Sequence, residues 1–419
     1  MLKQFTTLAL LTTTIALQLR AAEEPTAPPR VAMKFNFSSG KVKRGWTQIL
    51  PAAIYDATNG FGFEPGANRT AGNNFITSDK PFLFSVKLPE GNYKITVTLG
   101  DTAGASTNTV KAEARRLMLE NVHTAKGKVA TQTITVNVRT PKISDDDHVH
   151  LKKREVDTEM ITWDDKLTLE FNGSRPCVRT LEIAPAPEVP TIFIAGDSTV
   201  CDQPAEPWNS WGQMLTRFLK PDVAVANYAE SGESVKSSLG ARRFEKIFNL
   251  MKPGDWLLIQ FGHNDMKDRV TDAQATYRTN LKEIIARTRA KGGTPVLITS
   301  MERKGGVNAP TLMGYPEAMR EVVREEGAAL IDLNAMSLIF YKALGADLGK
   351  AFQDGTHHNN YGSYELARCV VEGIKQNKLG LVKFLTKDSG KFDPAHPDPL
   401  EKFSVPPSAA RSTDKPEGN

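Results

Sequence analysis

The chain has 419 residues, of which 40% are hydrophobic and 24% charged, a composition typical of a folded protein that excludes long disorder. This length exceeds what one hydrophobic core usually supports, so we expect two domains. The formal net charge of +5 is spread along the chain, without the basic stripe of a nucleic-acid-binding protein, and three cysteines are too few for a disulfide framework.

The first residues have the pattern of a signal peptide. Lys3 precedes an apolar, threonine-rich run over residues 5–19, and Ala21 and Ala22 follow as small residues at a cleavage point. The run is shorter than the roughly 18 apolar residues that a membrane span needs, and no later segment of the sequence reaches that length. We therefore expect residues 1–22 to be removed on export, giving a secreted or periplasmic protein without a membrane partner.

From about Val31 to Ile183, apolar residues alternate with polar ones, which indicates half-buried β-strands. Such runs include Phe82 to Val86 and Tyr93 to Leu99, and turn sequences such as Asn172-Gly173 follow them. This pattern predicts an all-β sandwich or jelly-roll domain over residues 30–184.

Four aromatic residues near the start of this region have two interpretations. They are Trp46, Tyr55, Phe61 and Phe63. Aromatic faces stack on sugar rings, which would make the domain a carbohydrate-binding one. Alternation already places many aromatic side chains inside the sandwich, and this favours core packing.

Three prolines within residues 185–190 predict an extended linker. Beyond it, short apolar runs alternate with helical patterns such as Ala275 to Ala290 and Asn360 to Gln376, which is typical of a parallel sheet covered by helices. The candidate strands are Thr191 to Ala195, Val223 to Asn227, Trp256 to Phe261, Pro295 to Thr299 and Ala329 to Leu333. We expect a three-layer α/β domain with a five-stranded parallel sheet over residues 191–384, followed by a polar, unstructured tail over residues 385–419.

Four short motifs stand after predicted strands or before the last helix, where functional groups gather in open α/β sheets. Gly196-Asp197-Ser198 can expose a serine hydroxyl, although a helix-capping turn would look the same. Gly232 offers a backbone N–H and Asn264 a side-chain amide to a developing oxyanion, although both also suit ordinary turns. In Asp354-Gly355-Thr356-His357 the carboxylate can reach the imidazole, and a helix cap is the alternative.

All four motifs occur in one predicted α/β domain in the order Ser, Gly, Asn, Asp-x-x-His. In this the chain from Thr191 to about Leu379 resembles the GDSL/SGNH hydrolases, although Thr199 stands where the family name has leucine. Residues 194–200, 211–215, 260–265 and 354–357 are similar to those of rhamnogalacturonan acetylesterases. The N-terminal region resembles the galactose-binding-like β-sandwich that precedes such esterases in bacterial proteins. The resemblance implies a flavodoxin-like SGNH catalytic domain.

The resemblance and the residues jointly predict a catalytic triad and an oxyanion hole. His358 competes with His357 for the role of base, but only His357 has an aspartate three residues before it. The triad would be Ser198, His357 and Asp354, and the oxyanion hole would be formed by the N–H groups of Ser198 and Gly232 with the amide of Asn264.

Neighbouring residues have supporting roles in this hypothesis. Asp197 would fix the nucleophile loop through its hydrogen bonds. His263 and Trp208 would line the substrate cleft, with core packing as the alternative. The scattered histidines predict no metal site, and the mechanism requires no cofactor.

We expect a secreted acetylesterase that acts on an acetylated acidic plant polysaccharide, rhamnogalacturonan. One alternative is an esterase or lipase for another acyl ester or for a glycan such as acetylated xylan. A lipase would want a long apolar groove, whereas Asp202, Gln203 and Glu206 near the serine are polar. The other alternative is a non-catalytic glycan-binding protein.

Overall fold

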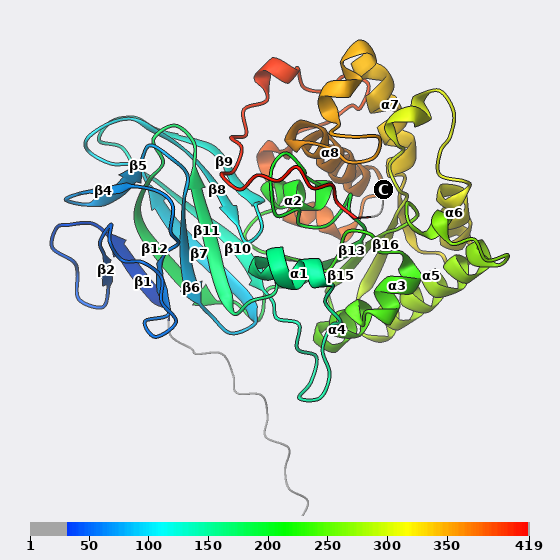
Figure 1. Ribbon diagram of the computed structural model, residues 1–419, viewed down its shortest axis with the longest axis horizontal. Coiled ribbons are helices and arrows are strands. Elements are labelled where there is room, and N and C mark those ends of the chain that lie inside the picture. Colours follow the sequence, from blue (N-terminus) through cyan, green and yellow to red (C-terminus); the bar gives the residue numbers. More distant parts are fainter. Residues whose placement is uncertain (1–31, 418–419) are drawn as a thin grey trace, which may run out of the picture.

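The computed structural model describes residues 32–417 (Figure 1). The predicted signal peptide, residues 1–22, lies outside this range. A part made of strands lies on the left of Figure 1, and a part in which helices surround a sheet lies on the right. No helix among the described residues is long and apolar enough to cross a membrane.

The N-terminal part consists of two sheets. One has seven strands in the order β10-β7-β12-β1-β2, with β5 paired to β12 and β4 paired to β5. Its strands are β1 Met33–Phe37, β2 Thr47–Ile49, β4 Arg69–Gly72, β5 Phe75–Ser78, β7 Gly91–Leu99, β10 Ala130–Val138 and β12 Cys177–Pro185. The other has five strands in the order β3-β6-β11-β8-β9. Its strands are β3 Phe61–Phe63, β6 Phe82–Lys87, β8 Ser106–Ala112, β9 Arg116–Thr124 and β11 Lys166–Asn172. All pairings are antiparallel except that of β1 with β2.

Aromatic rings from both sheets meet in one core. The Phe84 ring lies 4.9 Å from that of Phe37 and 5.3 Å from that of Phe63, centroid to centroid. Phe63 is fully buried, so the structure gives it core packing rather than sugar stacking. Trp46 and Tyr55 are only half-buried, and Lys34 and Lys166 lie over their rings.

The predicted linker is packed rather than free. Ala186 and Val189 form a small apolar cluster with Ala224. Asn92 Nδ2 donates to the carbonyl of Val189 at 3.2 Å and to Thr191 Oγ1 at 2.9 Å. These contacts attach the segment to both parts of the chain, so it does not act as a flexible spacer.

The second part is built on a five-stranded sheet in the order β14-β13-β15-β16-β17. Its strands are β13 Thr191–Gly196, β14 Ala224–Asn227, β15 Trp256–Gln260, β16 Thr294–Ile298 and β17 Ala329–Ile331. Every pairing is parallel, so all five carboxyl ends lie at one edge. The chain order reverses next to β13, and this is where ligands bind in open α/β sheets.

Helices cover both faces of this sheet. The α-helices of the described chain are α1 Lys153–Thr158, α2 Trp211–Leu215, α3 Val235–Gly240, α4 Arg243–Leu250, α5 Ala273–Ala290, α6 Tyr315–Glu326, α7 Leu333–Leu344 and α8 Asn360–Gln376. The short 3-10 helices are η1 Met160–Thr162, η2 Thr216–Phe218, η3 Asp265–Lys267, η4 Lys304–Val307, η5 Gly345–Ala351, η6 Gly380–Phe384, η7 Lys387–Ser389 and η8 Leu400–Lys402.

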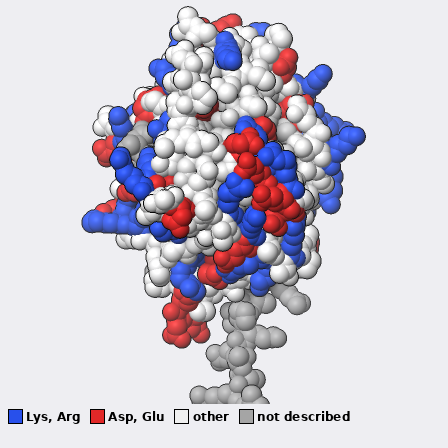
Figure 2. Space-filling model, turned by 90° about the vertical axis from the view of Figure 1, so that its right-hand side faces the viewer, with Lys and Arg blue, Asp and Glu red and all other residues white. Residues whose placement is uncertain are grey.

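Alternate residues of β13 enter opposite cores, which gives three layers. Ile192 and Ile194 pack in the cluster that contains α2, α7 and α8, whereas Phe193 and Ala195 pack with α4, α5 and α6. The outer faces of α5 and α6 carry paired charges, such as Lys282 Nζ with Glu325 Oε2 at 2.7 Å. Figure 2 shows acidic and basic side chains interleaved on the side of the molecule where these helices lie.

The turn between β8 and β9 joins the two parts through buried polar contacts. Arg115 lies 2.6 Å from Glu206 and Arg116 lies 2.7 Å from Asp202, and all four side chains are at most 5% exposed. Gln213 Nε2 of α2 donates to a carbonyl in the same turn at 2.6 Å. The N-terminal sheets therefore form part of the support beneath the loop that follows β13.

The C-terminal segment, which composition predicts to be unstructured, is held by polar contacts. Lys111 Nζ donates to the carbonyl of Pro406 at 2.8 Å, and the N–H of Ser408 donates to Glu206 Oε1 at 2.8 Å. Regular secondary structure is scarce here, but the segment crosses both parts of the molecule and ends beside the carboxyl edge of the parallel sheet (Figure 1).

Candidate active site

Ser198 lies in the turn that follows β13. The carbonyl of Asp197 accepts the N–H of Val200 at 2.9 Å, which tightens this turn. A Cβ at Gly196 would lie only 2.8 Å from the carbonyl oxygen of Gln260, so glycine allows β13 and β15 to approach at this point. Ser198 is 2% exposed, and its Oγ lies 2.8 Å from His357 Nε2.

His357 and Asp354 come from the loop between η5 and α8. Asp354 Oδ2 lies 2.8 Å from His357 Nδ1, and Asp354 Oδ1 accepts the backbone N–H groups of Thr356 and His357 at 2.7 Å each. Burial tends to raise the pKa of Asp354, but these hydrogen bonds hold it well below its ordinary value. A carboxylate on Nδ1 leaves the Nε2 lone pair facing the Ser198 hydroxyl.

His358 faces away from this group. Its Nε2 lies 2.9 Å from Tyr341 Oη, and its ring packs against Phe352 at 4.1 Å between centroids. Burial, together with the neighbouring His357, lowers the pKa of His358 to about 3, so this ring is neutral. The two adjacent histidines therefore have different surroundings, and only His357 contacts Ser198 and Asp354.

Gly232 and Asn264 lie in the loops that follow β14 and β15. Gly232 has a φ of +77°, a backbone conformation that suits glycine. Asn264 Nδ2 donates to the carbonyl of Glu233 at 3.0 Å, and Lys267 Nζ donates to Asn264 Oδ1 at 2.9 Å. These two bonds orient the amide with its N–H groups toward the 231–233 loop.

His263 lies beneath the nucleophile loop. It is 1% exposed, with Nδ1 3.1 Å from Asp197 Oδ2 and Nε2 3.0 Å from the carbonyl of Met301. Both ring nitrogens are thus engaged by the protein, which leaves none for the expected contact with substrate. Asp197 also accepts the N–H of Thr199 at 2.9 Å, which agrees with its expected role in fixing the loop.

Trp208 lies beside the histidine of the site. Its ring packs edge-on against that of His357 at 5.8 Å between centroids. It lines a cavity of about 380 Å³ whose other walls include Arg154, Gln203 and residues 410–416 of the C-terminal segment, excluding Thr413. Trp208 therefore lies between the histidine and this cavity.

Two residues near the serine were missed by the sequence analysis as site residues. Gln203 Nε2 donates to the carbonyl of Ser198 at 2.7 Å and lies 3.3 Å from Ser231 Oγ. Lys152, from the N-terminal half of the chain, donates from Nζ to the carbonyl of Ser231 at 2.5 Å. No local motif marks Lys152, because Ser231 is 79 residues away, and Gln203 lies outside the Gly196-Asp197-Ser198 motif. Within residues 32–417, no group of three His, Cys, Asp or Glu side chains is arranged to hold a metal ion.

Comparison with known proteins identifies the family. Residues 194–363 match the model of the GDSL-like lipase/acylhydrolase family. The rhamnogalacturonan acetylesterase RhgT of Bacillus subtilis (strain 168) is 35% identical over 222 residues, which cover 48% of this chain and 96% of that protein. The chain belongs to the GDSL-like lipase/acylhydrolase family. It is therefore a carboxylic ester hydrolase, and the alternative of a non-catalytic glycan-binding protein is set aside.

Other relatives match different shares of the chain. An uncharacterized esterase, YxiM of B. subtilis (strain 168), is 29% identical over 381 residues, 84% of this chain and 93% of that protein. A probable rhamnogalacturonan acetylesterase of the same organism, YesY, is 34% identical over 212 residues, 47% of this chain and 98% of that protein. The crystal structure of B. subtilis YxiM covers 84% of this chain and 99% of that chain, with 25% identity and a TM-score of 0.46.

Proposed function

We propose that this esterase removes O-acetyl groups from rhamnogalacturonan, an acidic plant polysaccharide, and that Ser198, His357 and Asp354 are its catalytic triad. The observation that carries the chemistry is the hydrogen-bonded chain from Ser198 Oγ through His357 to Asp354, with both links at 2.8 Å. The substrate is supported by the names of two relatives at 35% and 34% identity.

The reaction proceeds in two halves. His357 Nε2 takes the proton of Ser198 as Oγ attacks the acetyl carbonyl, and a tetrahedral oxyanion forms. The sugar oxygen leaves with that proton, so the first product is a free hydroxyl and Ser198 is acetylated. His357 then deprotonates a water molecule, which attacks the acyl-enzyme and releases acetate, and the proton returns to Ser198. Asp354 stabilises the imidazolium in both halves.

The oxyanion is received by the N–H groups of Ser198 and Gly232 and by the amide of Asn264. The bond from Asn264 Nδ2 to the carbonyl of Glu233 joins the two loops that carry Gly232 and Asn264, which supports a preorganised set of donors. Preorganised donors of this kind contribute about 3–4 kcal/mol each to stabilisation of the transition state.

We further propose how the chain divides into domains. Residues 191–384 form the flavodoxin-like esterase domain, residues 30–184 an accessory jelly-roll domain, residues 185–190 their connection and residues 385–419 a polar segment. Residues 1–22 direct export to the periplasm or medium. The mass of the protein recovered outside the cytoplasm tests the last point, because it would lack these residues.

The central experiment measures acetate release from acetylated rhamnogalacturonan and from acetylated xylan. Wild type is compared with Ser198→Ala and with Ser144→Ala, in which an exposed serine is replaced. We expect release from rhamnogalacturonan by wild type and Ser144→Ala only. Release that persists in Ser198→Ala would refute the triad. Release confined to xylan would keep the mechanism and replace the substrate.

A further inference from the structure

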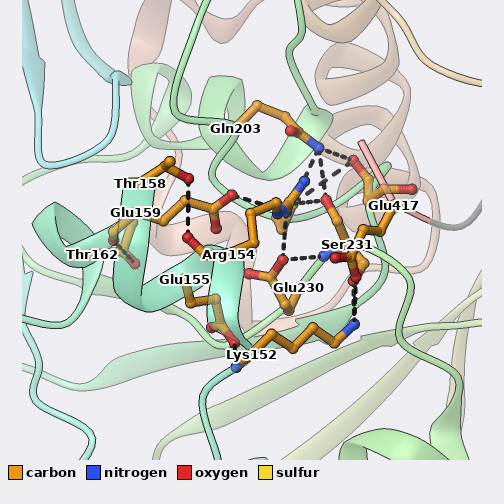
Figure 3. A network of polar contacts seen from close by, with 12 residues as sticks. Lys152, Arg154, Glu155, Thr158, Glu159, Thr162, Gln203, Glu230, Ser231 and Glu417 are labelled. Atoms are coloured by element: carbon orange, nitrogen blue, oxygen red, sulfur yellow. Dashed lines mark hydrogen bonds and ion pairs between the residues drawn. The ribbon is translucent and has the colours of Figure 1, made fainter. Parts of the chain in front are cut away.

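The ammonium group of Lys152 lies beside the loop of the proposed oxyanion hole. Its Nζ is 2.5 Å from the carbonyl oxygen of Ser231 and 3.1 Å from Glu233 Oε1. Figure 3 shows its side chain extending from the start of α1 to Ser231. A Cβ on Gly232 would lie 3.1 Å from this nitrogen, so the charge stands next to the backbone that would bind the oxyanion.

Lys152 is held in this place by its own backbone. Its N–H donates to Glu155 Oε2 at 2.8 Å, and that fully buried carboxylate accepts a hydrogen bond from Arg243 Nη2 at 2.6 Å. The N–H of His150 donates to the carbonyl of Ala241 at 2.9 Å. The segment before α1 is thus attached to the α3–α4 turn, and the lysine has a defined position.

Glu417 supplies a third partner. A lysine ammonium has three N–H donors, and Ser231 and Glu233 take two of them. Glu417 Oε2 lies 3.4 Å from Nζ. The Glu417 side chain is 49% exposed, whereas that of Glu233 is 2% exposed. Glu417 is therefore the partner that another carboxylate can replace.

Glu417 also lies over the glycine of the proposed oxyanion hole. A Cβ on Gly232 would lie 3.1 Å from Glu417 Cβ. The preceding residues of the C-terminal segment form one wall of the cavity of about 380 Å³ that Trp208 lines. A carboxylate of the chain itself thus lies beside the glycine of the proposed oxyanion hole.

The buried acidic side chains near Lys152 do not exclude an anion from this position, because cationic side chains compensate them. Burial, reinforced by the neighbouring Glu159 and Glu155, raises the pKa of Glu230 well above its ordinary value. Arg154 Nη2 lies 2.6 Å from Glu230 Oε1 and compensates this carboxyl group. Glu233 is compensated by Lys152 and by Arg243 at 3.9 Å.

We infer that Lys152 binds a carboxylate of the substrate and that Glu417 is an internal occupant of this position, which an acidic substrate displaces. This inference rests on the proposed function and names what selects the acidic substrate. An acetylated uronic acid, or an acetylated sugar joined to one, carries ester and carboxylate within a few atoms of each other. The carboxylate of such a substrate binds Lys152 while its acetyl carbonyl lies next to the Ser198 hydroxyl.

The test uses the full chain and a neutral reporter substrate, 4-nitrophenyl acetate. Its hydrolysis is inhibited with D-galacturonate and, separately, with the methyl ester of the same sugar. We expect the inhibition constant of galacturonate to be about tenfold lower than that of the ester, the value of one charge-assisted hydrogen bond. This comparison does not depend on which polysaccharide is the natural substrate.

Two variants, each with a matched control, assign the effect. Lys152→Met removes the preference for galacturonate over its methyl ester, and Lys153→Met, on an adjacent exposed lysine, keeps it. Because Lys152 also holds the carbonyl of Ser231, the ratio of the two inhibition constants is the readout rather than the rate. Glu417→Gln lowers the inhibition constant of galacturonate about twofold to fivefold, and Glu401→Gln does not.

A preference that survives in Lys152→Met overturns the inference, and so does equal inhibition of wild type by both sugars. Glu417→Gln without effect removes the part that concerns the internal occupant. These failures are distinct from failure of the proposed function, which would appear as Ser198-independent hydrolysis or as absence of acetate release from rhamnogalacturonan.

Discussion

The imidazole of His263 and the carboxylate of Asp197 form a buried pair directly below the nucleophile, with Nδ1 3.1 Å from Oδ2. Nε2 of the same ring lies 3.0 Å from the carbonyl oxygen of Met301, so both ring nitrogens face oxygen atoms of the protein. Burial tends to raise the pKa of Asp197, and the charge of His263 and the bonds from Thr199 hold it below its ordinary value. The pair ties the loop after β13 to the loops after β15 and β16.

Loss of this pair should reduce both stability and turnover. In His263→Leu the buried Asp197 carboxylate keeps its bonds from Thr199 but loses its partner on Oδ2, which should lower the free energy of unfolding by about 3–5 kcal/mol. A displaced Ser198 should lower kcat by about 100-fold. Urea unfolding and steady-state kinetics measure the two effects. Adding Asp197→Asn should restore part of the stability but not the rate, and wild-type stability of His263→Leu would contradict a stabilising contact between His263 and Asp197.

The amide of Asn264 should act only in the transition state. Asn264→Ala removes a proposed oxyanion donor, so kcat should fall about 10²- to 10³-fold with little change in KM. Asn308→Ala, which changes an exposed asparagine, serves as the control. Since Lys267 holds the amide oxygen, Lys267→Met should lower kcat by a smaller factor. A rise in KM at constant kcat would instead assign Asn264 to ground-state binding.

His358 should make the protein sensitive to acid. The ring is neutral in the folded protein because burial lowers its pKa to about 3, but in the unfolded chain it takes a proton below its ordinary value of 6.5. The unfolded state therefore binds more protons between these values, and stability falls as the pH falls from 6.5 toward 3. In His358→Gln this contribution is absent, so the melting temperature should decline less between pH 7 and pH 4. If the melting temperatures of wild type and His358→Gln declined equally, His358 would be excluded as the source of the acid sensitivity.

Much of the α/β part could be predicted because its signals are local. The helix expected from Asn360 to Gln376 has these bounds in the structure, and the strand expected from Thr191 to Ala195 extends by one residue. Apolar periodicity and strand ends are properties of neighbouring residues. The order of the four motifs placed Ser198 near His357 for the same reason, because parallel strands end at one edge.

Contacts between distant segments could not be predicted in this way. Nothing around Arg115 in the sequence indicates that it meets Glu206, and nothing around Lys152 indicates Ser231. The C-terminal segment is polar, which favours disorder, but Ser408 is buried because Lys111 and Glu206 supply buried partners for its polar atoms. Polar burial depends on partners rather than on composition.

Arg115 should affect catalysis although it belongs to the N-terminal sheets. Its guanidinium donates to the carbonyls of Gln203 and Trp208 at 3.1 and 2.9 Å, besides its ion pair with Glu206. Arg115→Met leaves Glu206 with weaker compensation, which should lower the free energy of unfolding by about 3 kcal/mol. It should also lower kcat, because the loop after the nucleophile loses its anchor. Thermal unfolding and acetate release measure both, with the exposed Arg44→Met as control.

The contacts of the turn between β8 and β9 also determine where mutations that abolish activity would map in the sequence. A screen for loss of deacetylation would recover substitutions in this short hairpin of the sandwich together with those around the serine. Genetic mapping would then place a catalytic defect in what looks like an accessory module. Exchange of that module between related esterases would succeed only when the turn and the loop opposite it, with Asp202 and Glu206, are exchanged as a set.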